Sequence, residues 1–225
     1  SLYNHCYGDK SMSKLHFLHS GGDKVTLTTP TNNPSTNPVF KLPQTDGSAG
    51  QVLKTDGNGN LSWVSLPASG LQMADQWRRT GTLNTNGGEN FITTDWNRVS
   101  GGGLGTLGTG MSESGGIFTF PSTGIYLVTW QAYAETSTTS GVNAVNIYVT
   151  TDNSSYSNRA SSLFSMEYDM SGYNYGNGHA SAMIDVTNVS NVKVKFRVYS
   201  AGNVAWDISS AENRNCATFL RLGDT

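Results

Sequence analysis

The run of residues 116–130 constrains the fold more than any other stretch of this chain. It begins with the β-branched and aromatic residues 117–120, and it ends with residues 125–130, whose side chains alternate across a sheet. Between them, Pro121 stops the first strand, and Gly124 can adopt the positive φ that a reversal of the chain needs. We predict two strands joined by a tight turn. Such a pair is not stable alone in water, so further strands must cover its apolar face.

Further strand patterns follow downstream. Residues 192–198 show the clearest period of two, because Lys193, Lys195 and Arg197 form a polar face opposite an apolar one. We predict strands in the ranges 142–150, 160–166, 179–186, 192–199 and 217–222. Residues 166–178 are rich in glycine and aperiodic, which argues against a central strand. The sequence therefore predicts an all-β domain of about eight to ten strands.

Composition limits the function of such a domain. The chain has 225 residues, 36% of them hydrophobic, and no apolar run approaches the length that spans a membrane. The formal net charge is −2 and only 13% of residues are charged, so the basic surface that binds nucleic acid is not expected. We therefore expect no membrane insertion and no nucleic-acid partner. The 26 glycines, ten tyrosines and five tryptophans are typical of turn-rich β structure with a polar surface, which suits an extracellular or virion protein.

The run 116–130 also resembles a known family. Phe-Thr-Phe-Pro followed by Gly-Ile-Tyr is similar to the signature of the complement C1q and tumour-necrosis-factor-like jelly rolls. Residues 91–99 are similar to that family's first core strand, and residues 217–222 to its closing strand. The resemblance covers residues 74–224 and implies a jelly-roll β-sandwich that assembles about a threefold axis. The aromatic residues expected in the core or at the trimer axis are Trp77, Phe91, Trp96, Phe118, Phe120, Tyr126, Trp130, Phe196 and Phe219.

A second resemblance lies upstream. Thr45-Asp46-Gly47 recurs as Thr55-Asp56-Gly57, and each copy introduces a short strand, residues 51–54 and 61–64. The segment has too few apolar side chains to close a core within one chain, but three copies around an axis could bury them: Val52, Leu53, Leu61 and Trp63. It resembles a module of tail-fibre and appendage proteins from marine bacteriophages and large algal viruses, where a variable distal head follows. The implied location is the virion surface, after synthesis in the host cytoplasm.

These patterns divide the chain into three parts. Five of the six prolines precede Ala68, which indicates a change of architecture. We predict a β-rich shaft or attachment segment at 1–67, a linker at 68–73 and a jelly-roll head at 74–225. The N-terminal segment is expected to contact other virion proteins.

Catalytic and metal sites find little support in the sequence. Three of the four histidines lie in the first segment, so only His179 could serve a Ser-His-Asp arrangement in the head. The glycine-rich run 101–110 lacks the Lys-Ser/Thr of a phosphate loop. Some members of the C1q-like family bind calcium, and the acidic candidates here do not cluster: Asp152, Glu167, Asp169 and Asp207. We expect no enzyme activity, no cofactor, no metal, and two unpaired thiols at Cys6 and Cys216.

The remaining hypothesis is recognition of a host surface, a glycan or a protein. Residues 168–178 combine tyrosines with amides and glycines, the mixture that binds the apolar faces and hydroxyls of sugars. The candidate ligand-binding residues are Tyr168, Tyr173, Asn174 and Tyr175. Two alternatives stay open: that the tyrosines cover a neighbouring protomer, and that the whole chain is a structural capsid or tail decoration protein. A secreted cellular C1q-like protein is disfavoured because the chain lacks a Gly-X-Y stalk.

Overall fold

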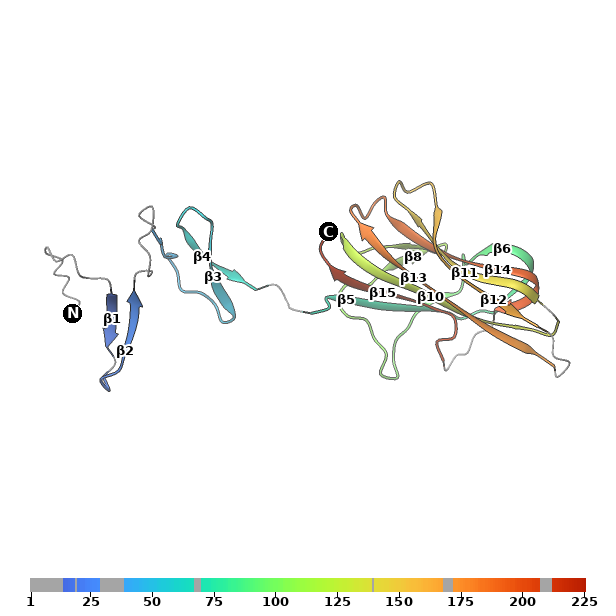
Figure 1. Ribbon diagram of the computed structural model, residues 1–225, viewed down its shortest axis with the longest axis horizontal. Helices are drawn as coiled ribbons and strands as arrows, with labels where there is room; N and C mark the ends of the chain where they lie inside the picture. Colours follow the sequence, from blue (N-terminus) through green and yellow to red (C-terminus); the bar gives the residue numbers. More distant parts are fainter. Residues whose placement is uncertain are drawn as a thin grey trace. The chain divides into compact units, whose positions relative to one another are not determined.

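The computed structural model describes residues 14–18, 20–28, 39–66, 70–138, 140–167, 172–206 and 212–225. All regular secondary structure within these ranges is β-strand, so the expected all-β fold class is confirmed. The chain forms two compact units, Ser1–Pro67 and Ala68–Thr225, which are described separately (Figure 1).

The first unit contains two antiparallel hairpins. One joins β1 (Lys14–Leu18) to β2 (Lys24–Thr28), and the other joins β3 (Gln51–Thr55) to β4 (Leu61–Ser65). In the turn of the second hairpin, the Asp56 carboxylate accepts hydrogen bonds from the backbone N–H groups of Asn58 and Asn60. The second Thr-Asp-Gly, residues 55–57, therefore lies in a tight turn that the Asp56 side chain stabilises.

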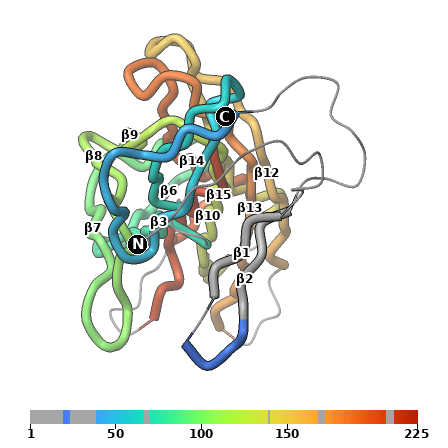
Figure 2. The backbone as a smooth tube through the Cα atoms, turned by 90° about the vertical axis from the view of Figure 1, so that its left-hand side faces the viewer, coloured from blue at the N-terminus to red at the C-terminus, as the bar shows by residue number. Residues whose placement is uncertain are grey.

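The second unit, the head, consists of two sheets that can be followed in Figures 1 and 2. Sheet I has the order β7 (Trp96–Arg98), β5 (Met73–Arg79), β15 (Cys216–Gly223), β10 (Gly124–Thr136) and β13 (Asn174–Val186). Sheet II has the order β12 (Ser157–Met166), β11 (Ser140–Thr150) and β14 (Lys193–Trp206). Two further strands pair with β14, namely β6 (Leu83–Phe91) and β9 (Ile117–Thr119), and β8 (Ser112–Ser114) pairs with β9. The sheets meet at a single pair, Glu135 with Ala205.

The strands expected on either side of Pro121 exist, but they do not pair with each other. β9 belongs to sheet II through β14, whereas β10 lies in the middle of sheet I. The turn between them therefore passes from one sheet to the other. The Tyr126 hydroxyl donates to the Ser122 carbonyl at 3.0 Å and fixes this crossing. At Gly124, where φ is 140°, an added Cβ would lie 2.5 Å from the Gly223 carbonyl, so the glycine is required for close packing as well as for conformation.

The core lies between the sheets. β10 alternates buried and half-buried residues along its whole length, as the period of two requires. Phe118 is fully buried, and its ring meets four others from both sheets at centroid distances of 5.0–5.5 Å. Of the aromatic residues expected in the core, seven are buried: Trp96, Phe118, Phe120, Tyr126, Trp130, Phe196 and Phe219. Trp77 is half-buried and packs against this cluster.

Three expectations need correction. Residues 91–99 are not one strand, because β6 ends at Phe91 and a turn with Asp95 at φ 64° precedes β7. Phe91 is not a core residue: it is 38% exposed and packs against Tyr148, on the outward face of sheet II. The strand expected at 179–186 begins earlier, since β13 starts at Asn174 within the glycine-rich stretch. In the described structure β13 pairs with β10 alone, so it is an edge strand and not a central one. Its Gly176 and Gly178 leave room for the Phe164 ring, whose carbons lie where a Cβ would stand.

Candidate functional site

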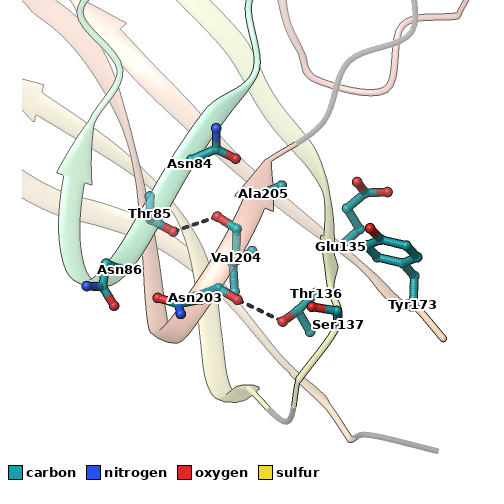
Figure 3. Close-up of a pocket in the computed structure, with 10 residues that line it drawn as sticks. All are labelled: Asn84, Thr85, Asn86, Glu135, Thr136, Ser137, Tyr173, Asn203, Val204 and Ala205. Carbon is teal, nitrogen blue, oxygen red and sulfur yellow. Dashed lines mark hydrogen bonds between the residues drawn. The ribbon is translucent and has the colours of Figure 1, made fainter. Parts of the chain in front are cut away.

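A polar pocket lies at the corner where sheets I and II join. The register places three outward-facing residues in one row across the strands, Glu135 of β10, Ala205 of β14 and Asn84 of β6. A second pair, Asn203 and Asn86, lies beside this row. Because Ala205 carries only a methyl group, it leaves a hollow between the longer side chains on either side. The cavity has a volume of about 360 Å³, and Tyr173 completes its wall. Figure 3 shows Glu135 and Tyr173 on one side and the two β6 asparagines on the other.

The floor of the pocket is fixed by internal hydrogen bonds. The buried Thr85 hydroxyl donates to the Val204 carbonyl at 3.0 Å, and the buried Thr136 hydroxyl donates to the Asn203 carbonyl at 2.7 Å (Figure 3). The Trp206 indole N–H in turn donates to the Thr85 hydroxyl at 3.3 Å. These contacts tie β6, β14 and β10 together, so the pocket is formed before any ligand arrives.

The rim differs from the floor because its amide and carboxylate groups have no partners among the described residues. The side chains of Asn84, Asn86 and Asn203 are exposed and make no hydrogen bond to any other group in the described ranges. The Glu135 carboxylate is half-buried and likewise has no hydrogen bond or ion pair there. Free amides and a free carboxylate therefore converge on one cavity.

The candidate residues expected from the sequence separate into two places. Tyr173 lines the pocket and is 59% exposed. Tyr175 is equally exposed and is the register partner of Glu135, but its ring stacks on Tyr133 at 5.7 Å and does not line the pocket. Asn174 pairs with Thr136 in the register and is half-buried, and its amide nitrogen has no partner in the described structure. Tyr168 lies outside the described residues. Of the three candidates that the structure describes, one thus lines the cavity.

Sequence reasoning missed the asparagines and Glu135. They come from three strands that are far apart in the sequence, and their convergence depends on a bulge. β14 has two residues, Ala201 and Gly202, where β6 has one, Gly87, which takes a φ of 81°. A Gly87-Gly88 pair inside a strand pattern is the signal that could have indicated this bend.

The pocket lies at the end of the head opposite to the start of β5. Ile125, at the beginning of β10, pairs with Gly223, and Met73 pairs with Arg221, so the head's first and last strands meet there (Figure 1). Glu135 lies ten residues further along β10, which is roughly 30 Å at ~3.3 Å per residue. A head held through its N-terminal side would therefore expose the pocket.

The outward face of sheet I carries a row of apolar side chains nearer to the start of β5. Met183 of β13, Leu127 of β10 and Leu220 of β15 are neighbours in the register. Met183 is 71% exposed and the other two are half-buried. The described part of the first unit also exposes large apolar side chains, among them Phe40 at 70% and Leu42 at 74%. The described residues of each unit thus leave apolar surface of that unit exposed.

The glycine-rich run 101–110 is held by a buried carboxylate. Asp75 of β5 has a side chain with no exposed surface, and it accepts hydrogen bonds from the Met111 backbone N–H at 2.7 Å and the Trp77 indole N–H at 2.9 Å. The Arg98 guanidinium bonds to the same carboxylate at 3.0 Å. At Leu107 the run also pairs with Ala74 of β5 through two backbone hydrogen bonds. The role seen here is anchoring of a long loop onto sheet I.

Groups that could support catalysis lie apart. In the described ranges no three His, Cys, Asp or Glu side chains are grouped so that they could hold a metal ion. His179 is exposed on β13, opposite Gln131. Asp152 lies in a turn, where its carboxylate accepts hydrogen bonds from the Ser155 and Ser154 backbone N–H groups. These bonds hold the pKa of Asp152 well below its usual range. Asp169, Asp207 and Cys6 lie outside the described residues, and the free thiol of Cys216 is buried.

No protein-family profile matches the sequence, and no curated protein sequence matches it. Solved structures do match. The structure of Eiger TNF from S. frugiperda aligns with a TM-score of 0.53 and 11% identity over 69% of this chain and 95% of that one. Murine APRIL at pH 5.0 aligns with a TM-score of 0.49 and 12% identity over 67% of this chain and 98% of that one. The head has the jelly-roll fold of a tumour-necrosis-factor-like protein. No helix in the described part of the chain is long and apolar enough to cross a membrane.

Proposed function

We propose that this chain is a homotrimeric virion fibre or appendage protein whose jelly-roll head binds the host cell surface, through a glycan, without catalysing a reaction. The observation that carries the proposal is the uncovered apolar surface on both units of one chain, together with a fold that presents a preformed polar pocket. A binding protein needs such a pocket and no catalytic groups.

The trimer is supported by the apolar row on sheet I. Met183, Leu127 and Leu220 would stay in contact with water in a lone head, at a cost of about 25 cal/mol per Å² of apolar surface. The surface is continuous across three strands of a rigid sheet, and other copies of the same chain can cover it around an axis. The small hairpin unit, residues 39–66, has the same need, because Phe40, Leu42 and Leu53 are exposed. A common axis satisfies both units, and the resemblance of the head favours a threefold one.

The virion role is supported by the sequence module around the two Thr-Asp-Gly turns. It resembles fibre modules that precede a distal head, and the structure supplies a hairpin at that place and a head after it. The N-terminal segment would then join the chain to other virion proteins. A virion-surface location follows from this role.

The proposal is tested in two measurements on the full chain. Multi-angle light scattering should give three times the 24.1 kDa of one chain. Replacement of Leu127 and Met183 by Glu should lower that mass. The control is Val142→Glu, which changes an exposed apolar residue of sheet II and should leave the mass unchanged. A monomeric wild-type protein would refute the trimer.

Binding is measured separately, with the wild-type trimer on immobilised mannan, galactan, glucan, alginate and heparin and on intact candidate host cells. We expect saturable binding to at least one of these surfaces. A trimer that binds none of them is the result expected for a structural decoration protein, and it would overturn the recognition role.

A further inference from the structure

We propose that the corner pocket binds one uncharged sugar unit of a glycan, with the Tyr173 ring as its stacking surface and with Glu135, Asn84 and Asn203 as its hydrogen-bond partners. This inference rests on the proposed glycan-binding function and deepens it, because it names the site and the chemical class of the ligand.

Size and shape support a small ligand. The cavity of about 360 Å³ is near the lower end of the range for small-molecule sites, which begins at roughly 300 Å³. Its floor is the backbone of β14, held to its neighbours by the Thr85 and Thr136 hydroxyls. A sugar ring would therefore meet a surface that does not need to reorganise, and little binding energy would be lost in ordering it.

The chemistry of the rim matches a ring of hydroxyl groups. Each hydroxyl both donates and accepts hydrogen bonds, so it can bind a carboxamide or a carboxylate. Asn84 and Asn203 each offer an NH₂ donor and a carbonyl acceptor, and neither is used within the described structure. Tyr173 adds an exposed aromatic face, which suits the apolar C–H face of a sugar.

Charge decides between uncharged and acidic sugars. Glu135 is the only charged side chain among the described residues that line the pocket, and it has no cationic partner there. A sulfate or carboxylate placed within about 4 Å of it would be repelled, and more strongly in a sheltered site than in open water. The same carboxylate strongly accepts hydrogen bonds from neutral hydroxyls. The pocket therefore favours uncharged sugars.

The lining of the cavity, and not the register, assigns Tyr173 to the site in place of Tyr175. Tyr175 is the register partner of Glu135, but its ring stacks on Tyr133 and does not line the cavity. Tyr173 precedes β13 and reaches the corner beside Glu135 (Figure 3). In a trimer the three pockets would lie at the same end of the assembly, so weak individual sites would act together on a polymer.

The test compares variants of the full-length protein by surface plasmon resonance on immobilised mannan, galactan and glucan, with alginate and heparin as acidic probes. Tyr173→Ala removes the stacking surface, Asn84→Ala removes one amide, and Ala205→Phe fills the hollow with a residue that strands tolerate well. Asn158→Ala is the matched control, because this asparagine is also exposed on a strand of sheet II but lies on β12, outside the pocket. Light scattering and thermal unfolding verify that each variant remains folded and assembled.

We expect the wild type to bind a neutral probe, the three pocket variants to bind it at least tenfold more weakly, and Asn158→Ala to bind it normally. Wild-type affinity in both Tyr173→Ala and Ala205→Phe would overturn the pocket assignment but leave the proposed function standing. Binding of the wild type to the acidic probes alone would overturn the assignment to uncharged sugars. Binding to no probe and no cell would instead remove the proposed function itself.

Discussion

Replacement of Asp75 by Asn should strongly destabilise the head, although Asp75 lies in a short strand. The substitution keeps the shape of the side chain but removes its charge and turns one acceptor oxygen into a donor. In either orientation of the amide the NH₂ group would face a donor already in place: the Met111 N–H at 2.7 Å and the Trp77 indole N–H at 2.9 Å on the Oδ2 side, or the Arg98 guanidinium at 3.0 Å on the Oδ1 side. The Arg98 guanidinium, 3.0 Å away, would lose its carboxylate.

The magnitude follows from burial. The Asp75 side chain has no exposed surface, whereas Arg98 is 40% exposed, so water can solvate the guanidinium that is left behind. The loss therefore comes from the buried side: a hydrogen bond to a charged group is worth roughly 1.5–3 kcal/mol and a buried donor left unsatisfied costs roughly 1–3 kcal/mol, which together give roughly 3–5 kcal/mol. For a domain of this size, each kcal/mol lowers the melting temperature by roughly 2–4 °C, so a decrease of about 6–20 °C is expected. Because Asp75 also anchors the loop of residues 101–110, proteolysis within that loop should become faster.

Differential scanning calorimetry at a fixed protomer concentration measures the effect, since assembly makes the melting temperature depend on concentration. The matched control is Glu212→Gln. Its ion pair with Arg214 is at the surface, with the side chains 62% and 38% exposed, so a change within about 1 kcal/mol is expected. Equal melting temperatures for the two variants would refute the reasoning, because burial would then not determine how much a carboxylate contributes to the free energy of unfolding.

Three further predictions concern the core, the thiol and the domain boundary. Phe118→Ala should cost about 3–5 kcal/mol in urea unfolding because the ring is fully buried among four others, whereas Phe91→Ala, at a 38% exposed ring, should cost clearly less; similar losses would contradict the assignment of the core. Burial raises the pKa of Cys216 to about 11, so in a Cys6→Ser background iodoacetamide at pH 8 should label this thiol only after unfolding. Labelling is measured by mass spectrometry, and rapid labelling of the native protein would show instead that the thiol is accessible. Limited proteolysis should cut between Val64 and Ala74 and release a head that begins near Leu71 and unfolds cooperatively, and a fragment without a cooperative transition would argue against the predicted boundary.

Much of the strand pattern could be predicted from the sequence. Alternation of apolar and polar residues is a local property with a period of two, so it places strands and separates their two faces without knowledge of partners. Residues 192–198 illustrate this: Val194, Phe196 and Val198 are all buried in β14. Of the aromatic residues expected in the core or at the trimer axis, seven are buried in the core. Phe91 is not, because it ends an edge strand whose outward side carries its own aromatic neighbours.

Pairing was decided only by the tertiary structure. The strands on either side of Pro121 look like a hairpin in sequence, yet they lie in different sheets, because the core between the sheets offers Phe118 and Tyr126 more burial than a free hairpin could. The candidate site has the same origin. Asn84, Glu135 and Ala205 carry no shared sequence signal, since contacts between distant strands depend on register and on the bulge near Gly87. The sequence determines which residues face outward; the fold determines which of them meet around one pocket.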